Sequence, residues 1–144
     1  MNKIKESDIC VQFLLRTALQ KVNQISKSKL SPYGVTPAQY GLLRCLWKKD
    51  GQLSATLGER LKLDSATITG MIDRLEQNGF IERRLDPKDR RNRLIFLTEK
   101  GTSMKEPLCK KMDEMNEEVR SLFDDKEFQQ FKKILFGIGI KENN

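Results

Sequence analysis

Basic side chains that could bind a polyanion are concentrated between residues 83 and 93. This segment reads RRLDPKDRRNR and holds six Lys or Arg against two Asp, which gives it a net charge of +4. Asp86-Pro87 and Asp89 favour a turn, and strand-forming residues flank the segment at Phe80-Ile81 and at residues 94–97. A basic hairpin tip suits the phosphate backbone or the narrow minor groove of DNA, where the potential is most negative. The alternative is a solvated charged loop, as most charge runs are.

A helical pattern directly precedes this basic segment. Asp64 predicts an N-cap, and Asn78-Gly79 predicts a left-handed end. One face of the pattern is apolar at helical spacing, with Ile68, Met71, Ile72 and Leu75. The other face carries short polar side chains that can approach base edges closely, and it holds Ser65, Ala66, Thr67, Thr69, Gly70, Arg74 and Gln77. Taken alone, the pattern also fits an ordinary amphipathic helix.

A shorter pattern before this helix favours the DNA-binding interpretation. Ser54 is expected to cap a helix with Leu57 and Leu61 on its inner face, and Lys62-Leu63 leaves room only for a sharp corner. Two helices joined by a brief turn and followed by a hairpin outline a winged helix-turn-helix, which places one helix in the major groove. A winged helix that contacts an acidic protein instead of DNA remains an alternative.

Longer helical patterns lie on both sides of this lobe. Residues 4–30 predict a helix whose apolar stripe is Ile9, Phe13, Leu14, Ala18, Val22 and Ile25. Thr36, Pro37 and Gln39 predict a capping box for the next helix, in which Trp47 is expected to pack in the core rather than line a ligand pocket.

Two further helices are expected after the hairpin. Thr98 should cap the first, and Pro107 should kink or divide it. Asp124-Asp125 should open the last helix, whose stripe is Phe128, Phe131, Leu135 and Ile138. A monomer of 144 residues is too small to bury both terminal apolar stripes as well as the core of its lobe. These stripes therefore predict contact with a second subunit.

Length and composition predict one domain with a mainly α (α+β) fold. Hydrophobic residues make up 38% and charged residues 33%, and the net charge is +7. This charge favours a polyanion, either nucleic acid or an anionic membrane. No apolar run approaches the length of a membrane span, and Gln12 and Arg16 interrupt any N-terminal signal core. We therefore expect a cytoplasmic protein without a membrane partner.

An enzyme is not expected. The chain has no histidine, which excludes a His-based triad and an imidazole metal site. It also lacks a Gly-rich phosphate loop and a nucleophile elbow, so we expect neither metal nor cofactor. The three cysteines, Cys10, Cys45 and Cys109, include no C-x-x-C pair and are expected to be small core residues or free thiols.

Residues 35–101 resemble the MarR family of bacterial transcriptional regulators. The family's wing pattern, D-x-R, a strand and L-T-x-x-G, stands at Asp89-Arg90-Arg91, residues 94–96 and residues 97–101. The recognition-helix pattern stands at residues 64–69, 73–76 and 79–81, and the T-x-x-Q-[FY] helix start stands at residues 36–40. The resemblance implies three regions within the single domain: a dimerisation helix at 1–34, a DNA-binding lobe at 35–98 and dimerisation helices at 99–144.

The resemblance also implies a function. Family members are homodimers in which two recognition helices about 34–36 Å apart read a palindromic operator in double-stranded DNA. We expect a sequence-specific regulator, more often a repressor than an activator. A small phenolic or other amphipathic effector between the dimerisation helices and the lobe is expected to modulate DNA binding.

Site residues follow from the same pattern. Bases and phosphates are expected to be contacted by Ser65, Thr67 and Thr69, with Ala66 on the same face. Arg74 should contact the DNA backbone. Asp89 is expected to orient Arg91 toward the minor groove, while phosphate contacts are assigned to Lys88, Arg90 and Arg93. Residues 64–79 carry a net charge of −2, so most of the electrostatic affinity is expected from the wing.

Two departures from the family pattern matter. Gly70 stands where many relatives carry a larger side chain. Hydroperoxide-sensing members use an N-terminal cysteine with nearby tyrosines, whereas Cys10 lies a few residues too early and residues 4–30 contain no tyrosine. We therefore expect a structural Cys10, behaving as a small buried hydrophobe, and keep a thiol-based redox sensor as the alternative.

Overall fold

The computed structural model describes residues 5 and 10–141. Seven α-helices, one short 3-10 helix and three strands are described, in the order α1 (Val11–Leu30), η2 (Ser31–Tyr33), α2 (Pro37–Lys48), β1 (Gln52–Leu53), α3 (Ser54–Leu61), α4 (Ser65–Gln77), β2 (Ile81–Leu85), β3 (Arg93–Leu97), α5 (Glu99–Ser103), α6 (Lys105–Arg120) and α7 (Asp125–Gly139). The strands form one antiparallel sheet in the order β1-β3-β2. The predicted mainly α fold with a small hairpin wing is confirmed.

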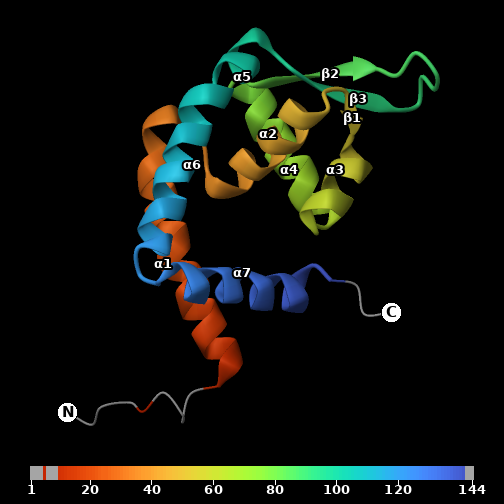
Figure 1. Ribbon diagram of the computed structural model, residues 1–144. Helices are drawn as coiled ribbons and strands as arrows, with labels where there is room; N and C mark the ends of the chain where they lie inside the picture. The colour runs from red at the N-terminus through yellow and green to blue at the C-terminus, as the bar shows by residue number, and fades with distance from the viewer. Residues whose placement is uncertain (1–4, 6–9, 142–144) are drawn as a thin grey trace.

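The elements separate into a lobe and a set of outer helices. In Figure 1, α2, α3, α4 and the hairpin lie together at one end, α1 and α6 run side by side away from them, and α7 projects across the far end of α1. The core of the lobe is continuous with the α1–α6 pair through Leu30 and Leu108, both fully buried. The lobe is therefore carried on the ends of two packed helices.

The core of the lobe follows the predicted apolar faces. All four apolar residues of the α4 stripe are buried, and Leu57 of α3 is 0% exposed. Burying each such side chain contributes about 1.5–3 kcal/mol. The opposite face of α4 is left at the surface because its side chains are short and polar.

Helix starts agree with the predicted caps at four positions. Thr36 and Gln39 form the complete capping box of α2. Asp64, Thr98 and Asp124 each accept a hydrogen bond from the backbone amide three residues later. Pro107 lies in the first turn of α6, and the chain divides at Met104, where α5 ends.

Three features of the lobe differ from the predictions. Ser54 is the first residue of α3 and not its cap, because Leu53 still pairs with Leu94 in the sheet and passes straight into the helix. The strand β1 was not expected. The strand β2 continues to Leu85, so Arg83 and Arg84 lie in a strand and not in the loop.

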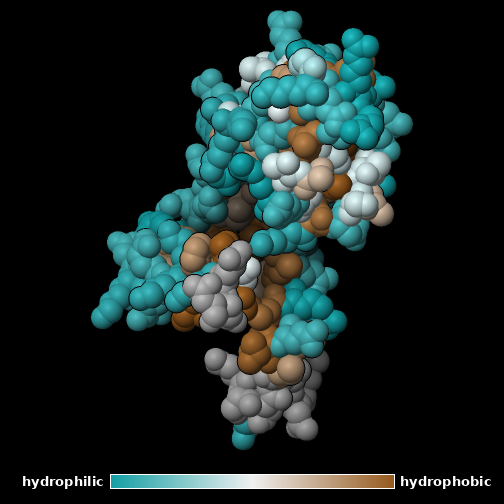
Figure 2. All heavy atoms as spheres, turned by 90° about the vertical axis from the view of Figure 1, so that its right-hand side faces the viewer, coloured by the Kyte–Doolittle hydropathy of each residue, from teal (hydrophilic) through white to brown (hydrophobic). Residues whose placement is uncertain are grey.

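The first helix is shorter than predicted. It begins at Val11, after an extended Cys10, whereas the predicted start at residue 4 and the stripe residue Ile9 lie outside the described residues. Phe13 and Leu14 are 44% and 38% exposed, and the α7 stripe ends in an exposed Ile138. Figure 2 shows hydrophobic residues gathered over this part of the molecule. Among the described residues, no helix is both long and apolar enough to cross a membrane.

A tight joint connects the hairpin to the end of α4. The amide of Thr98 donates to the Phe80 carbonyl at 3.0 Å, and its hydroxyl donates to the Gly79 carbonyl at 2.5 Å. Trp47 Nε1 donates to the Gly101 carbonyl at 2.9 Å, which connects the joint to α2 and agrees with a structural role for this residue. A Cβ added at Gly101 would overlap the Phe80 carbonyl oxygen, so only glycine fits there.

Substitution of this glycine tests the joint. Gly101→Ala should lower the free energy of unfolding by about 3 kcal/mol, because backbone must move to admit the methyl group. Gly70→Ala is the matched control: no atom lies within 4 Å of its Cβ, so it should raise stability by about 1 kcal/mol through helix propensity. Urea denaturation measures both, and equal effects of the two substitutions would contradict this account of the joint.

Candidate DNA-binding site

The recognition helix α4 presents an open polar face. Asp64 Oδ1 accepts the Thr67 amide at 2.7 Å, and this hydrogen bond lowers the pKa of Asp64, keeping the cap charged. The five residues predicted to face DNA from this helix are all exposed, namely Ser65, Ala66, Thr67, Thr69 and Arg74. Gly70 adds no side chain among them. The face is flat enough for close approach by another surface.

The wing tip at residues 86–92 is folded by its own aspartates. Asp86 Oδ1 accepts the Lys88 amide at 2.9 Å. Asp89 Oδ1 accepts the Arg91 amide at 3.0 Å and lies 3.3 Å from Arg91 Nε. The Arg91 side chain is nevertheless 91% exposed, so Asp89 holds its base while its end reaches outward.

The number of free cations on the wing is smaller than the sequence suggests. Arg83 pairs with Asp73 at 2.5 Å and with Glu76 at 2.6 Å. Arg84 pairs with Glu82, and its guanidinium lies 4.4 Å from the centre of the Phe96 ring. Lys88, Arg90 and Arg93 are exposed and take part in no ion pair among the described residues, whereas Arg91 is 91% exposed although its Nε lies 3.3 Å from Asp89 Oδ1. These are the four cations that the sequence analysis assigned to DNA.

Arg83 connects the wing to the recognition helix. Burial alone would lower the pKa of Arg83, but hydrogen bonds and the charges of Asp73 and Glu76 raise it. The same contacts offset one of the two negative charges of Asp73 and Glu76, which contribute to the net charge of −2 of residues 64–79. Sequence reasoning counted Arg83 as a free charge. The signal for the pairing was the spacing of Asp73 and Glu76, which lie three residues apart on one helix face.

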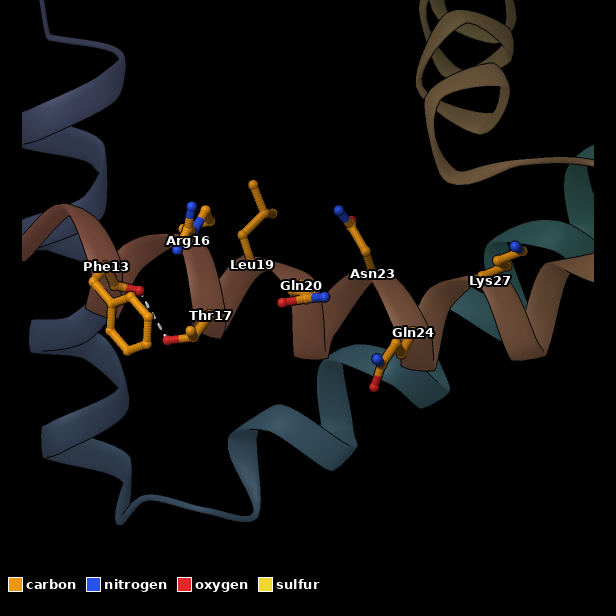
Figure 3. A pocket seen from close by; sticks show the side chains of 8 residues that line it. All are labelled: Phe13, Arg16, Thr17, Leu19, Gln20, Asn23, Gln24 and Lys27. Carbon is orange, nitrogen blue, oxygen red and sulfur yellow. Dashed lines mark hydrogen bonds between the residues drawn. The ribbon is translucent and has the colours of Figure 1, made fainter. Parts of the chain in front are cut away.

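A second region of interest lies along α1. A groove of about 800 Å³ is lined by eight α1 residues, and Figure 3 shows Arg16, Leu19 and Asn23 projecting to the same side. A smaller hollow of about 470 Å³ shares Asn23 and Lys27 with this groove and reaches the start of α2 at Thr36, Pro37 and Ala38. The two hollows together run from the outer helix to the lobe.

The cysteines differ in their surroundings. Cys10 is exposed, so the expectation of a buried Cys10 is wrong within the single chain: the residue precedes α1 and packs against none of the core. Cys45 and Cys109 are partly buried against the core. Tyr40 donates its hydroxyl to Cys109 Sγ at 3.8 Å, and burial with this contact raises the pKa of Tyr40 to about 12. No cluster of His, Cys, Asp or Glu among residues 5 and 10–141 could hold a metal ion.

Known proteins share this arrangement. The model of the MarR family matches residues 35–92. The organic hydroperoxide resistance transcriptional regulator of Bacillus subtilis (strain 168) is 38% identical over 101 residues, which cover 70% of this chain and 67% of that protein. The chain belongs to the MarR family. Members of this family are transcriptional regulators and not enzymes.

Solved MarR structures extend the likeness to the whole fold. The MepR–DNA complex of Staphylococcus aureus superposes with a TM-score of 0.84 at 25% identity, covering 90% of this chain and 97% of that one. PcaV of Streptomyces coelicolor in complex with its natural ligand gives a TM-score of 0.85 at 25% identity, with 96% of both chains covered. The fold of this MarR protein is thus shared by one structure that holds DNA and another that holds a small molecule.

Removal of the Arg83 contacts tests their structural role. Arg83→Gln should lower the free energy of unfolding by about 1 kcal/mol, as expected for a paired surface network. It should leave the salt dependence of DNA binding nearly unchanged, because its charge is already neutralised by Asp73 and Glu76. Denaturant unfolding and binding to duplex DNA over a range of salt concentrations measure both quantities. A change in salt dependence without loss of stability would show that Arg83 is a direct phosphate contact.

Proposed function

We propose that this MarR-family protein is a cytoplasmic, sequence-specific repressor that binds a palindromic operator as a homodimer. The observation that carries the proposal is the open polar face of α4 together with four exposed cations at and next to the tip of the hairpin that follows it. The helix face reads base edges in the major groove, with Ser65, Thr67 and Thr69 as hydrogen-bonding groups and Ala66 as a small apolar contact. The wing supplies phosphate and minor-groove contacts through Lys88, Arg90, Arg91 and Arg93.

Dimerisation is supported by the apolar surface of the outer helices. Val11 and Leu19 on α1 are 66% and 60% exposed, and Ile134 and Phe136 on α7 are 61% and 53% exposed. Contiguous apolar surface of this kind is rare on monomers and marks an interface. We assign residues 1–34 and 99–144 to dimerisation and residues 35–98 to DNA binding, within one domain. A two-fold axis then sets the spacing of the two recognition helices.

An effector site is proposed in the groove along α1. Phe13 and Leu19 offer apolar contacts, while Arg16 and Lys27 offer positive charge, so the groove suits an amphipathic, phenolic or acidic small molecule. The groove shares Asn23 and Lys27 with the smaller hollow that reaches the start of α2, so the two together extend from a dimerisation helix to the lobe. A ligand that favours a different spacing of the lobes weakens DNA binding by linkage.

Wing variants test the DNA-binding proposal. Arg90→Gln should reduce the slope of log affinity against log salt by about 1, because the exposed Arg90 is assigned to a phosphate contact that is then lost. Arg84→Gln removes the same charge from the same hairpin, but Arg84 is already paired with Glu82 and should change the slope much less. Fluorescence anisotropy with duplex DNA measures both variants. Equal reductions for the two variants would count against a specific role for the wing tip.

A thiol-based redox sensor is a second candidate, supported by the exposure of Cys10 and by the similarity to the organic hydroperoxide resistance regulator. In this case the Cys10 thiolate is oxidised to a sulfenic acid while the peroxide is reduced to an alcohol. An organic hydroperoxide should then weaken DNA binding of the wild type by about tenfold, a typical allosteric coupling. Cys10→Ser should abolish the response and Cys45→Ser should retain it. A response that survives in Cys10→Ser rules this candidate out.

A further inference from the structure

A cationic cleft lies between α2 and α3, apart from the wing and from the exposed face of α4. It encloses about 320 Å³ and is lined by Gly41, Arg44, Cys45, Lys48, Arg60 and Leu61. The four α2 residues are spaced i, i+3, i+4 and i+7, so they form one face of that helix. The two α3 residues complete the opposite wall.

The shape of the cleft follows from its small residues. Gly41 has no side chain, and a Cβ added there would lie 3.5 Å from Leu61 Cδ2, so the two helices approach closely at the base. Cys45 is small and only partly exposed. The floor of the cleft is therefore narrow and weakly polar. Three exposed cations line the cleft above it, namely Arg44, Lys48 and Arg60. The longest side chains of the cleft are therefore all positively charged.

These three cations have no acidic partner. None of them takes part in an ion pair among residues 5 and 10–141, and no Asp or Glu lines the cleft. Elsewhere on the molecule, Arg83 and Arg120 each pair with two carboxylates. Like charges that line one cleft without a counter-charge favour a bound anion.

We propose that this cleft binds a phosphate group. Two guanidinium groups and one ammonium group match a tetrahedral anion with two negative charges, because arginine can donate two parallel hydrogen bonds to its oxygens. A weakly polar floor strengthens these interactions by excluding water from one side. The phosphate comes either from a small phosphorylated molecule or from the DNA backbone, since α3 is the helix of a helix-turn-helix that crosses the backbone.

A protection experiment on the full-length protein tests the small-molecule source. The rate of Cys45 alkylation is measured by peptide mass mapping, once in pyrophosphate and once in sodium chloride at equal ionic strength. The exposed Cys10 is the internal control. Pyrophosphate should slow alkylation of Cys45 by about tenfold and leave Cys10 unchanged. The protection should disappear in Arg44→Gln/Arg60→Gln and persist in the charge-matched Lys49→Gln/Lys126→Gln, whose residues lie outside the cleft.

The DNA source is tested with the same variants. In generic duplex DNA, Arg44→Gln/Arg60→Gln should reduce the salt slope by about 2 relative to the charge-matched control, one unit for each lost phosphate contact. If pyrophosphate protects Cys45 but the salt slope of DNA binding is unchanged, the phosphate belongs to a small molecule. If only the salt slope is reduced, the phosphate belongs to the DNA backbone. Neither effect, in a variant whose thermal unfolding matches that of the control, overturns the proposal. The protection experiment does not require DNA binding, so it remains decisive if the proposed function fails.

Discussion

The joint between the end of α4 and the start of α5 is the contact on which the rest of the structure depends. Thr98 hydrogen-bonds to the Gly79 and Phe80 carbonyls, and Gly101 packs directly on the Phe80 carbonyl. The hairpin between these points must therefore return to the helix it left, so its base is fixed at the end of α4. Trp47 connects the joint to α2. The motif L-T-x-x-G thus fixes the position of the wing relative to the recognition helix through the hydrogen bonds of Thr98 and the close contact at Gly101, which leaves no room for a side chain.

The basic residues of the wing fall into two groups according to their ion pairs. Arg83 and Arg84 are held by acids and an aromatic ring, so they stabilise the hairpin. Arg91 and its neighbours at the tip extend outward from a turn organised by Asp89. Pairing Arg83 with Asp73 and Glu76 also removes negative charge from the recognition helix, where it would repel phosphates. The electrostatic part of the affinity for DNA therefore depends on which cations are exposed at the tip, where Arg91 keeps its contact with Asp89, and not on how many basic residues the hairpin holds.

Local patterns predicted the lobe well, because α4 is specified by signals within its own residues: Asp64 at the start, an apolar stripe and Gly79 at the end. The strand β1 has two residues and exists only through pairing with Ile95 and Leu94, so no local pattern could indicate it. The Arg83 ion pairs join residues seven and ten positions apart on different elements, and a charge count cannot detect them. The exposure of Cys10 depends on where α1 begins, and helix starts without a cap side chain have a weak sequence signal.

Selection from fragmented genomic DNA of the source organism tests the central claim most directly. The purified protein is incubated with the fragments at about 150 mM salt, where purely electrostatic binding is weakened. A homodimer that reads sequence with α4 should enrich a palindrome whose half-sites lie about one helical turn, or 10–10.5 base pairs, apart. Binding that is sensitive to salt and enriches no common sequence would contradict the account, because the exposed face of α4 would then not read base edges.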